Sequence, residues 1–272
     1  MQKFKLALVQ MNSTNDLASN VAALEQSLSA AHAAGADWIA TPENTGLLGA
    51  DTADTLSKAQ PEASHPVLEL ARSFARKHSV WILLGSIHVR ADAERCRNRS
   101  YLIGADGQVV AYYDKIHMFD AKLPSGEYRE SAVFMPGERA VLAETPWGKL
   151  GMTICYDVRF AHLYRKLAQA GATMLSVPAA FTVPTGQAHW HVLLRTRAIE
   201  HGCYVFAPAQ VGLHANGRRT YGHSVIIAPW GEVLADAGDA GPGIIAAEID
   251  PEAVRQAREA LPSLRHDRPF EI

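Results

Sequence analysis

Three side chains that could support nucleophilic catalysis follow predicted strands in this sequence: Glu43, Lys115 and Cys155. A thiol can attack a carbonyl carbon once it loses its proton, a carboxylate can take that proton, and an ammonium group can stabilise the charge that develops. Ligands of α/β sheets gather at the carboxyl ends of the strands, so the three positions are compatible with one site. Charged residues also end strands without a catalytic role, so position alone leaves both interpretations open.

The residues around Cys155 favour the catalytic interpretation. Residues 150–154 are typical of a buried strand, and the turn into a helix follows directly. Such an elbow exposes a nucleophile and directs backbone N–H groups at the reacting oxygen. Cys96, in an Arg-rich loop, and Cys203, after the helix-stopping Gly202, are interpreted as structural thiols. Three widely spaced cysteines indicate neither a disulfide framework nor a zinc site, and they favour a reducing, cytoplasmic setting.

The elements that must position these side chains alternate between helices and short strands rich in Val, Ile and Leu, which indicates a layered α/β fold. Strands are expected at residues 4–10, 38–41, 81–89, 100–103, up to 114–115, 149–154, 174–177, 204–207, 224–228 and 244–249. Helices are expected from Leu17 to a stop at Gly35 and over residues 66–78, 161–170, 187–200 and 252–260. The segment 119–136 is long, polar and rich in turn residues, so it is expected to be a site loop.

Two similar phrases suggest that the plan repeats along the chain. "AAGADWIATPE" in the first half and "AQAGATMLSVPA" in the second both indicate a helix, Ala-Gly-Ala, a buried strand and proline. Such phrasing also arises by chance in α/β proteins. No shift in composition and no Ser/Gly-rich linker divides the chain, so residues 1–272 are predicted to form a single domain. The sequence has neither a GxGxxG motif nor a P-loop, which argues against nucleotide-binding folds.

The composition excludes several classes of partner. The 272 residues are 48% hydrophobic and 20% charged, with a formal net charge of −2, which gives no basic field for nucleic acid. No apolar run approaches the length needed to span a bilayer. The apolar stretch in the first residues, MQKFKLALVQM, is short and lacks an A-x-A cleavage pattern. A first strand is therefore favoured over a signal peptide.

Three ordered motifs carry a resemblance to a known family. They are Thr41-Pro42-Glu43, Tyr113-Asp114-Lys115-Ile116-His117-Met118-Phe119-Asp120 and the Cys155 elbow. With them, the chain resembles the nitrilase, or carbon–nitrogen hydrolase, superfamily over nearly its whole length, and within it most resembles the deaminated-glutathione amidases, with the ω-amidases next. The resemblance implies a four-layer αββα sandwich, a homodimer with sheets extended across the interface, and catalysis without a metal or organic cofactor.

The resemblance also implies roles for individual residues. Glu43 falls on the family's general base, Lys115 on its lysine and Cys155 on its nucleophile. Glu130 aligns best with a second glutamate that positions the lysine and substrate, although Glu127 lies close enough to be confused with it. The backbone amide of the residue after the cysteine, here Tyr156, contributes to the oxyanion hole in family members.

Substrate recognition is expected in the segments that follow. Arg159, four residues after Cys155, could clamp a carboxylate bidentately or be a structural arginine. Phe181 and Thr185 could line the pocket, and Phe181 could equally belong to the core. His191 and Asn44 stand where many relatives carry an acidic residue and an aromatic-containing segment, respectively, which puts deaminated glutathione itself in question.

Histidines in two motifs are interpreted without a catalytic or metal-binding role. His189 and His191 are two residues apart on a predicted helix and therefore face different sides, which argues against a metal pair. His117 is interpreted as a structural hydrogen-bonding group rather than a second base.

The leading hypothesis is an amidase that hydrolyses a small carboxylate-bearing amide to an acid and ammonia through a cysteine thioester. One alternative is a nitrilase or N-carbamoyl amidohydrolase that uses the same triad. Another is a catalytically silent nitrilase-like binding protein, against which the joint presence of Glu43, Lys115 and Cys155 argues.

Overall fold

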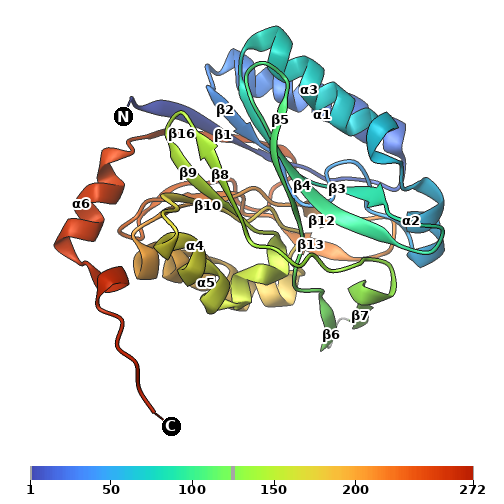
Figure 1. Ribbon diagram of the computed structural model, residues 1–272. Helices are drawn as coiled ribbons and strands as arrows, with labels where there is room; N and C mark the ends of the chain where they lie inside the picture. The colour runs from blue at the N-terminus through green and yellow to red at the C-terminus, as the bar shows by residue number, and fades with distance from the viewer. Residues whose placement is uncertain (1, 124–125, 272) are drawn as a thin grey trace.

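The computed structural model describes residues 2–123 and 126–271. Two six-stranded sheets face one another and carry helices on their outer faces (Figure 1). The layers therefore run helix, sheet, sheet, helix, which confirms the expected αββα sandwich.

The first sheet is built mainly from the N-terminal half of the chain. Its strands, in spatial order, are β16 (Gly243–Ile249), β1 (Phe4–Gln10), β2 (Trp38–Ala40), β3 (Trp81–Arg90), β4 (Cys96–Ile103) and β5 (Val109–Asp114). The central strands β1, β2 and β3 are parallel, and β16, β4 and β5 pair antiparallel with their neighbours.

The second sheet has the same plan. Its strands, in spatial order, are β8 (Val141–Thr145), β9 (Gly148–Met152), β10 (Met174–Ser176), β11 (Tyr204–Ala207), β14 (Val225–Ile227) and β15 (Val233–Asp236). Here β9, β10 and β11 are parallel, and the flanking strands are antiparallel. The two phrases that suggested a repeat therefore lead into equivalent central strands, β2 and β10.

Helices cover the outer face of each sheet. The first sheet carries α1 (Leu17–Ala33) and α3 (Pro66–His78), and the second carries α4 (Ala161–Gln169) and α5 (Val183–His201) (Figure 1). Two further helices, α2 (Thr52–Lys58) and α6 (Glu252–Ala260), complete the set of α-helices among the described residues. The predicted apolar face of α1 is turned inward, with Leu24 and Leu28 fully buried.

The hydrophobic core has two parts because β1 is buried on both faces. Phe4 and Leu6 point into the space between the sheets, whereas Ala7 and Val9 pack under α1 and α3. This alternation is the period-two geometry of a strand, and double burial explains why β1 reads as a continuous apolar run. Between the sheets, Phe4 stacks on Trp147 with ring centroids 4.4 Å apart.

Several short elements differ from the sequence-based prediction. The segment expected to be an irregular loop contains a hairpin of β6 (Asp120–Leu123) and β7 (Gly126–Arg129), followed by a 3-10 turn, η2 (Glu130–Ala132). The prediction also lacked α2, β8, β15 and the hairpin of β12 (Val211–Leu213) and β13 (Arg219–Tyr221). These strands have three to five residues, too few to show a clear apolar period.

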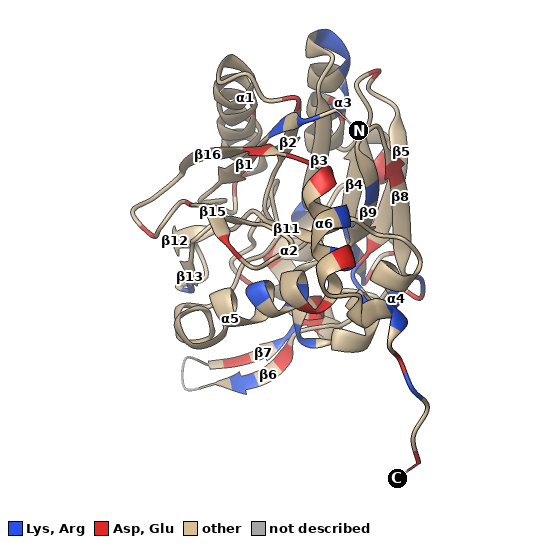
Figure 2. Ribbon diagram, turned by 90° about the vertical axis from the view of Figure 1, so that its left-hand side faces the viewer, with Lys and Arg blue, Asp and Glu red and all other residues tan. Residues whose placement is uncertain are grey.

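The charged residues are mixed over the fold. Figure 2 shows Lys and Arg alternating with Asp and Glu on α6 and on the β6–β7 hairpin, with no basic stripe on the side in view. None of the helices within residues 2–123 and 126–271 is long and apolar enough to cross a membrane.

Candidate active site

Glu43, Lys115 and Cys155 come from different sheets and meet in the structure. Glu43 follows β2 and Lys115 follows β5 of the first sheet, whereas Cys155 follows β9 of the second and begins the 3-10 helix η3 (Cys155–Arg159). Lys115 Nζ lies 2.9 Å from Glu43 Oε1, and the Glu43 carboxylate and the Cys155 thiol are close enough to shift each other's pKa. All three are buried, with exposed fractions of 3%, 2% and 7%.

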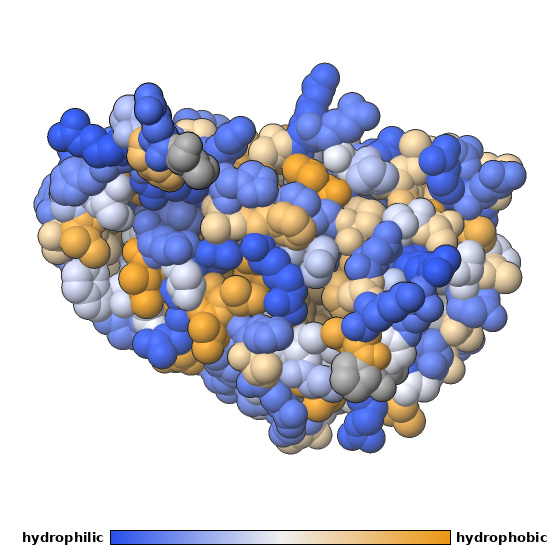
Figure 3. Space-filling model, turned by 90° about the horizontal axis from the view of Figure 1, so that it is seen from below, coloured by the Kyte–Doolittle hydropathy of each residue, from blue (hydrophilic) through white to orange (hydrophobic). Residues whose placement is uncertain are grey.

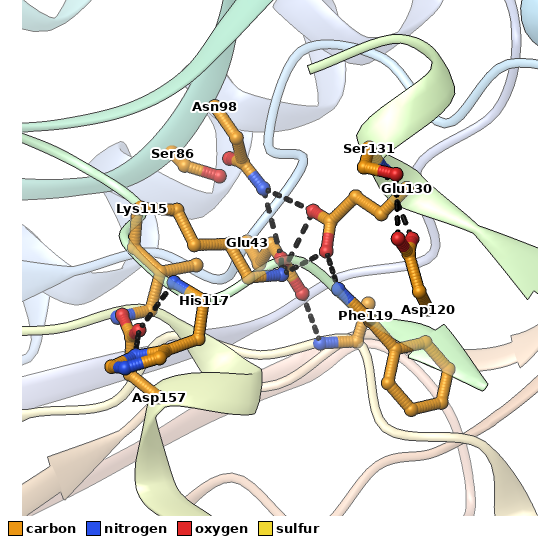
Figure 4. A network of polar contacts seen from close by, with 12 residues as sticks. Glu43, Ser86, Asn98, Lys115, His117, Phe119, Asp120, Glu130, Ser131 and Asp157 are labelled. Atoms are coloured by element: carbon orange, nitrogen blue, oxygen red, sulfur yellow. Dashed lines mark hydrogen bonds and ion pairs between the residues drawn. The ribbon is translucent and has the colours of Figure 1, made fainter. Parts of the chain in front are cut away.

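Glu130 joins this cluster from the turn after the β6–β7 hairpin. Both of its carboxylate oxygens lie 2.8 Å from Lys115 Nζ, and the Phe119 N–H donates to Oε2 at 2.6 Å (Figure 4). Glu127, the other candidate, points elsewhere and forms an exposed ion pair with Arg129 at 2.8 Å. Of the two glutamates, Glu130 is therefore the one that contacts Lys115.

Asn98 ties the two glutamates together. Its Nδ2 donates to Glu43 Oε1 at 3.0 Å and to Glu130 Oε1 at 3.2 Å (Figure 4). This residue was not among those predicted from the sequence. A polar residue at a buried position of the alternating strand β4 was the available signal.

The Cys155 elbow is held in an unusual backbone conformation. Cys155 has φ +50°, which non-glycine residues rarely adopt, and its N–H donates to the Pro178 carbonyl at 2.9 Å. Two residues on, the fully buried Asp157 carboxylate accepts from the Ile154 N–H at 2.9 Å and from Tyr113 Oη at 2.7 Å. A strained nucleophile held by surrounding hydrogen bonds is typical of active sites.

His117 braces the same elbow. Its Nδ1 lies 2.7 Å from Asp157 Oδ1 (Figure 4). Its ring stacks on Phe160, with ring centroids 3.5 Å apart. It is therefore directed to Asp157 and not to Cys155, in agreement with a structural role.

The electrostatics define the protonation of the resting site. Burial and the neighbouring Glu43 carboxylate raise the pKa of Cys155 well above its usual value. Burial also opposes ionisation of Glu43, but the charge of Lys115 and its hydrogen bond outweigh it and lower the pKa of Glu43. Burial likewise opposes the charge on Lys115, yet Glu130 and Glu43 raise its pKa. The resting site thus holds a neutral thiol, a carboxylate and an ammonium.

The cluster forms the floor of a cavity of about 270 Å³. The other expected binding residues, Tyr156, Arg159, Phe181 and Thr185, also line it. The Arg159 guanidinium lies over the Phe181 ring at 5.4 Å, so Phe181 is both largely buried and part of the pocket wall. The Thr185 hydroxyl forms a hydrogen bond with the Thr182 hydroxyl, with the two oxygens 2.8 Å apart. Asn44 lines the pocket as well, with its Oδ1 2.7 Å from His88 Nε2.

Comparison with known proteins agrees with this arrangement. A sequence profile described as carbon-nitrogen hydrolase matches residues 5–259. The chain belongs to the carbon–nitrogen hydrolase family. It is 43% identical to a deaminated glutathione amidase of Synechocystis over 271 residues, which cover 98% of both chains. It is 40% identical to the human deaminated glutathione amidase over 270 residues, 97% of this chain and 82% of that one.

Solved structures of the family share the fold. The NitFhit protein of C. elegans superposes with a TM-score of 0.91 and 38% identity over 98% of this chain, which spans 65% of that longer chain. Saccharomyces cerevisiae Nit3, described as a member of branch 10 of the nitrilase superfamily, superposes with a TM-score of 0.87 at 29% identity, covering 97% and 96% of the two chains. The family match and the amidases at 40–43% identity show that this protein is a hydrolase of carbon–nitrogen bonds.

The other two cysteines of this hydrolase lie apart from the cavity. Cys96 begins β4 and is fully buried, so its expected position in a loop was wrong, because β4 starts earlier than the apolar pattern suggested. Cys203 is buried too, and burial raises the pKa of its thiol to about 11. Both are free thiols. Arg258 Nη2 donates to Cys203 Sγ at 3.0 Å, and Arg90 and Asp92 are the charged neighbours of Cys96.

His189 and His191 of α5 face different partners, as expected. His189 Nδ1 lies 3.3 Å from the Arg159 guanidinium, whereas His191 Nε2 lies 2.8 Å from Asp236 Oδ2. His223 Nδ1 also contacts Asp236, at 3.0 Å, so His191, His223 and Asp236 form a group whose ligand atoms lie within 4.8 Å of one another and could hold a metal ion. As a metal ligand, His191 was weighed only together with His189, so this trio was not predicted from the sequence.

Proposed function

We propose that this protein is an amidase that hydrolyses small carboxylate-bearing amides such as deaminated glutathione, with Cys155 as nucleophile, Glu43 as general base and Lys115 as oxyanion stabiliser. The observation that carries the proposal is the Glu43–Lys115–Glu130 charge cluster that shares one cavity with the Cys155 thiol. The deaminated glutathione amidases at 40–43% identity support the choice of substrate.

The first half of the reaction forms a thioester. Glu43 takes the proton of the Cys155 thiol as the sulfur attacks the amide carbon, and the carbonyl oxygen becomes an oxyanion. Lys115 and the backbone N–H of Tyr156 stabilise that oxyanion, and one such donor is typically worth about 3 kcal/mol. The intermediate then collapses as the leaving nitrogen takes the proton from Glu43 and departs as ammonia or an amine.

The second half releases the acid. Glu43 removes a proton from a water molecule, which attacks the thioester carbon, and a second oxyanion forms in the same place. Its collapse expels the Cys155 thiolate, which regains the proton from Glu43. Glu130 and Asn98 hold Lys115 and Glu43 in position throughout, so we class them as positioning residues.

Arg159 is proposed to bind a carboxylate on the acyl group, with Phe181 and Thr185 shaping the wall beside it. An arginine presents parallel N–H donors that match a carboxylate, whereas a simple nitrile offers nothing for them to bind. This difference favours an amide of a dicarboxylic or peptide-like acid over a nitrile.

Turnover and labelling test the proposal together. The purified protein should hydrolyse deaminated glutathione or α-ketoglutaramate and leave simple nitriles and carbamoyl amino acids intact. An alkylating electrophile should modify Cys155, and Cys155→Ala should abolish both labelling and turnover while Cys203→Ala retains both. Turnover of nitriles alone would contradict the proposal, and so would a Cys155→Ala variant that is as active as the wild type.

The proposal extends to the assembly and its location, namely a cytoplasmic homodimer with no nucleic-acid or membrane partner. Exposed apolar side chains on α5 and the turn beside it, Val192, Ile199 and Trp230, support a self-association surface. Ile199 lies against this turn, at Gly231. Figure 3 shows that the face seen from below carries several apolar groups among hydrophilic residues. Light scattering during size exclusion should give twice the chain mass.

A further inference from the structure

The charges around the cavity fall into two kinds. Glu43 and Glu130 are paired with Lys115 at 2.8–2.9 Å. Arg159 and Arg218 also line the cavity, yet neither guanidinium has a carboxylate within ion-pair distance in the part of the chain that the structure describes. Positive charges that face a pocket without an internal partner are suited to an anionic ligand.

The remaining charged residues of the cavity do not compensate these two arginines. Glu127 and Arg129 pair with each other on the β6–β7 hairpin. The Asp51 carboxylate accepts the Asp54 N–H at 2.8 Å as the N-cap of α2. Each of these groups therefore already has a partner of its own.

Arg218 stands close to the general base. Its guanidinium donates to the Ala180 carbonyl. The backbone N–H of Ala180 in turn donates to Glu43 Oε2 at 2.9 Å. Burial opposes the charge of Glu43, and Arg218 is among the cations that nevertheless lower its pKa. The Nε of Arg218 is buried without a hydrogen-bond partner, so this guanidinium is only partly satisfied by the protein.

Arg159 stands on the other side, close to the nucleophile. It ends η3, the element that begins with Cys155, and its guanidinium lies over the Phe181 ring. Its polar contact is with His189 Nδ1, 3.3 Å from both terminal nitrogens, which leaves its charge without an opposite charge.

The reaction assigns the two arginines to different parts of the substrate. The acyl group becomes bonded to Cys155 and therefore extends near Arg159. The leaving nitrogen takes its proton from Glu43, so any substituent on that nitrogen lies on the Glu43 side, where Ala180 links Glu43 to Arg218.

We propose that Arg218 is a second anion subsite, which binds a carboxylate carried by the leaving amine, so that the preferred substrate has one carboxylate on each side of the scissile amide. This inference rests on the proposed amidase function and narrows its substrate class. Primary amides, which release ammonia, place nothing at Arg218. An N-substituted amide whose amine ends in a carboxylate engages both arginines.

Three substrates that share the same acyl group but differ in the leaving amine test this subsite. Deaminated glutathione carries a leaving-group carboxylate, its C-terminal amide replaces that carboxylate with a neutral group, and α-ketoglutaramate releases ammonia. The wild-type kcat/KM should be roughly 10- to 100-fold higher for deaminated glutathione than for its C-terminal amide, which is the range for one charge-assisted contact. Arg218→Gln should reduce this ratio to near one, and Arg218→Lys should restore part of it.

Arg219→Gln is the matched control. Arg219 is the next residue in the chain and is exposed, and its replacement by Gln removes the same charge. It should leave the ratio as in the wild type. A merely structural role for Arg218 would lower turnover of all three substrates alike and leave the ratio intact, which would overturn the subsite. A wild-type ratio near one would also overturn it. Failure to hydrolyse any of the three would instead overturn the proposed amidase function.

Discussion

Two sets of cavity residues, the catalytic end around Lys115 and the substrate end formed by Arg159 and Arg218 on either side of it, differ in how their charges are paired. At the catalytic end, Lys115 is buried between two carboxylates, and nearly every polar atom has a partner inside the protein. At the substrate end, Arg159 and Arg218 keep their charges without a carboxylate among the described residues. The first arrangement is preorganised for a charge that develops during the reaction, and the second is suited to a charge that arrives with the substrate.

The largest effect is expected from removing Lys115, the cation that Glu43 and Glu130 share. Lys115→Met leaves Glu43 and Glu130 buried together without a counter-charge, which should lower kcat/KM by about 10³-fold or more. It should also lower the free energy of unfolding by about 3–5 kcal/mol, the usual cost of breaking a buried ion pair. Denaturant titration and steady-state kinetics measure both, and Lys77→Met, at an exposed position, serves as the control. A Lys115→Met protein with normal stability would contradict the account of the catalytic end.

A second prediction separates the two glutamates. Glu130→Gln keeps the shape but removes one charge from Lys115, and it should reduce kcat by about 10- to 100-fold. Glu127→Gln removes the same charge from the exposed hairpin pair and should change kcat less than about twofold. Equal losses in both variants would mean that contact with Lys115 is not what matters.

At the substrate end, Arg159→Gln should raise KM for carboxylate-bearing amides by about tenfold and change kcat less, because it removes a binding contact and not a catalytic one. Steady-state kinetics with α-ketoglutaramate measures this directly. A fall in kcat at unchanged KM would move Arg159 to the catalytic end of the comparison.

The smallest expected effect is on the pH profile. The pKa of Glu43 is lowered in the folded protein, so its carboxylate adds stability above the unfolded value of about 4.3, and that stability is lost as the pH falls through the folded value. The acid limb of kcat/KM should accordingly lie below about 4.5, and Lys115, with its raised pKa, should give no alkaline limb below pH 10. Brief assays after pH jumps give the profile, and an acid limb near pH 6 would contradict it.

Most residues of both ends were predicted from the sequence, and one residue was missed at each end. Glu43, Lys115 and Cys155 each follow a strand whose apolar residues mark its position, and the elbow at Cys155 appears in the structure as its positive φ. Asn98 and Arg218 could not be found in this way. Asn98 lies within a strand whose alternation only hints at its burial, and Arg218 precedes a three-residue strand that carries no pattern.

The hairpin β6–β7 illustrates the same limit for the fold. Its strands are exposed and polar, so no hydrophobic period marks them, and their pairing positions Glu130 rather than building a core. The central strands, buried on both faces, were predicted because burial dictates their composition.

The path of the last strand has a consequence for how the molecule could be divided. The first sheet supplies Glu43 and Lys115 and the second supplies Cys155, yet β16, from the end of the chain, lies in the first sheet beside β1. Fragments separated between the two repeats would each be inert, and the C-terminal fragment would carry a strand that belongs to its complement. Activity recovered on mixing such fragments would therefore report directly on their correct reassembly.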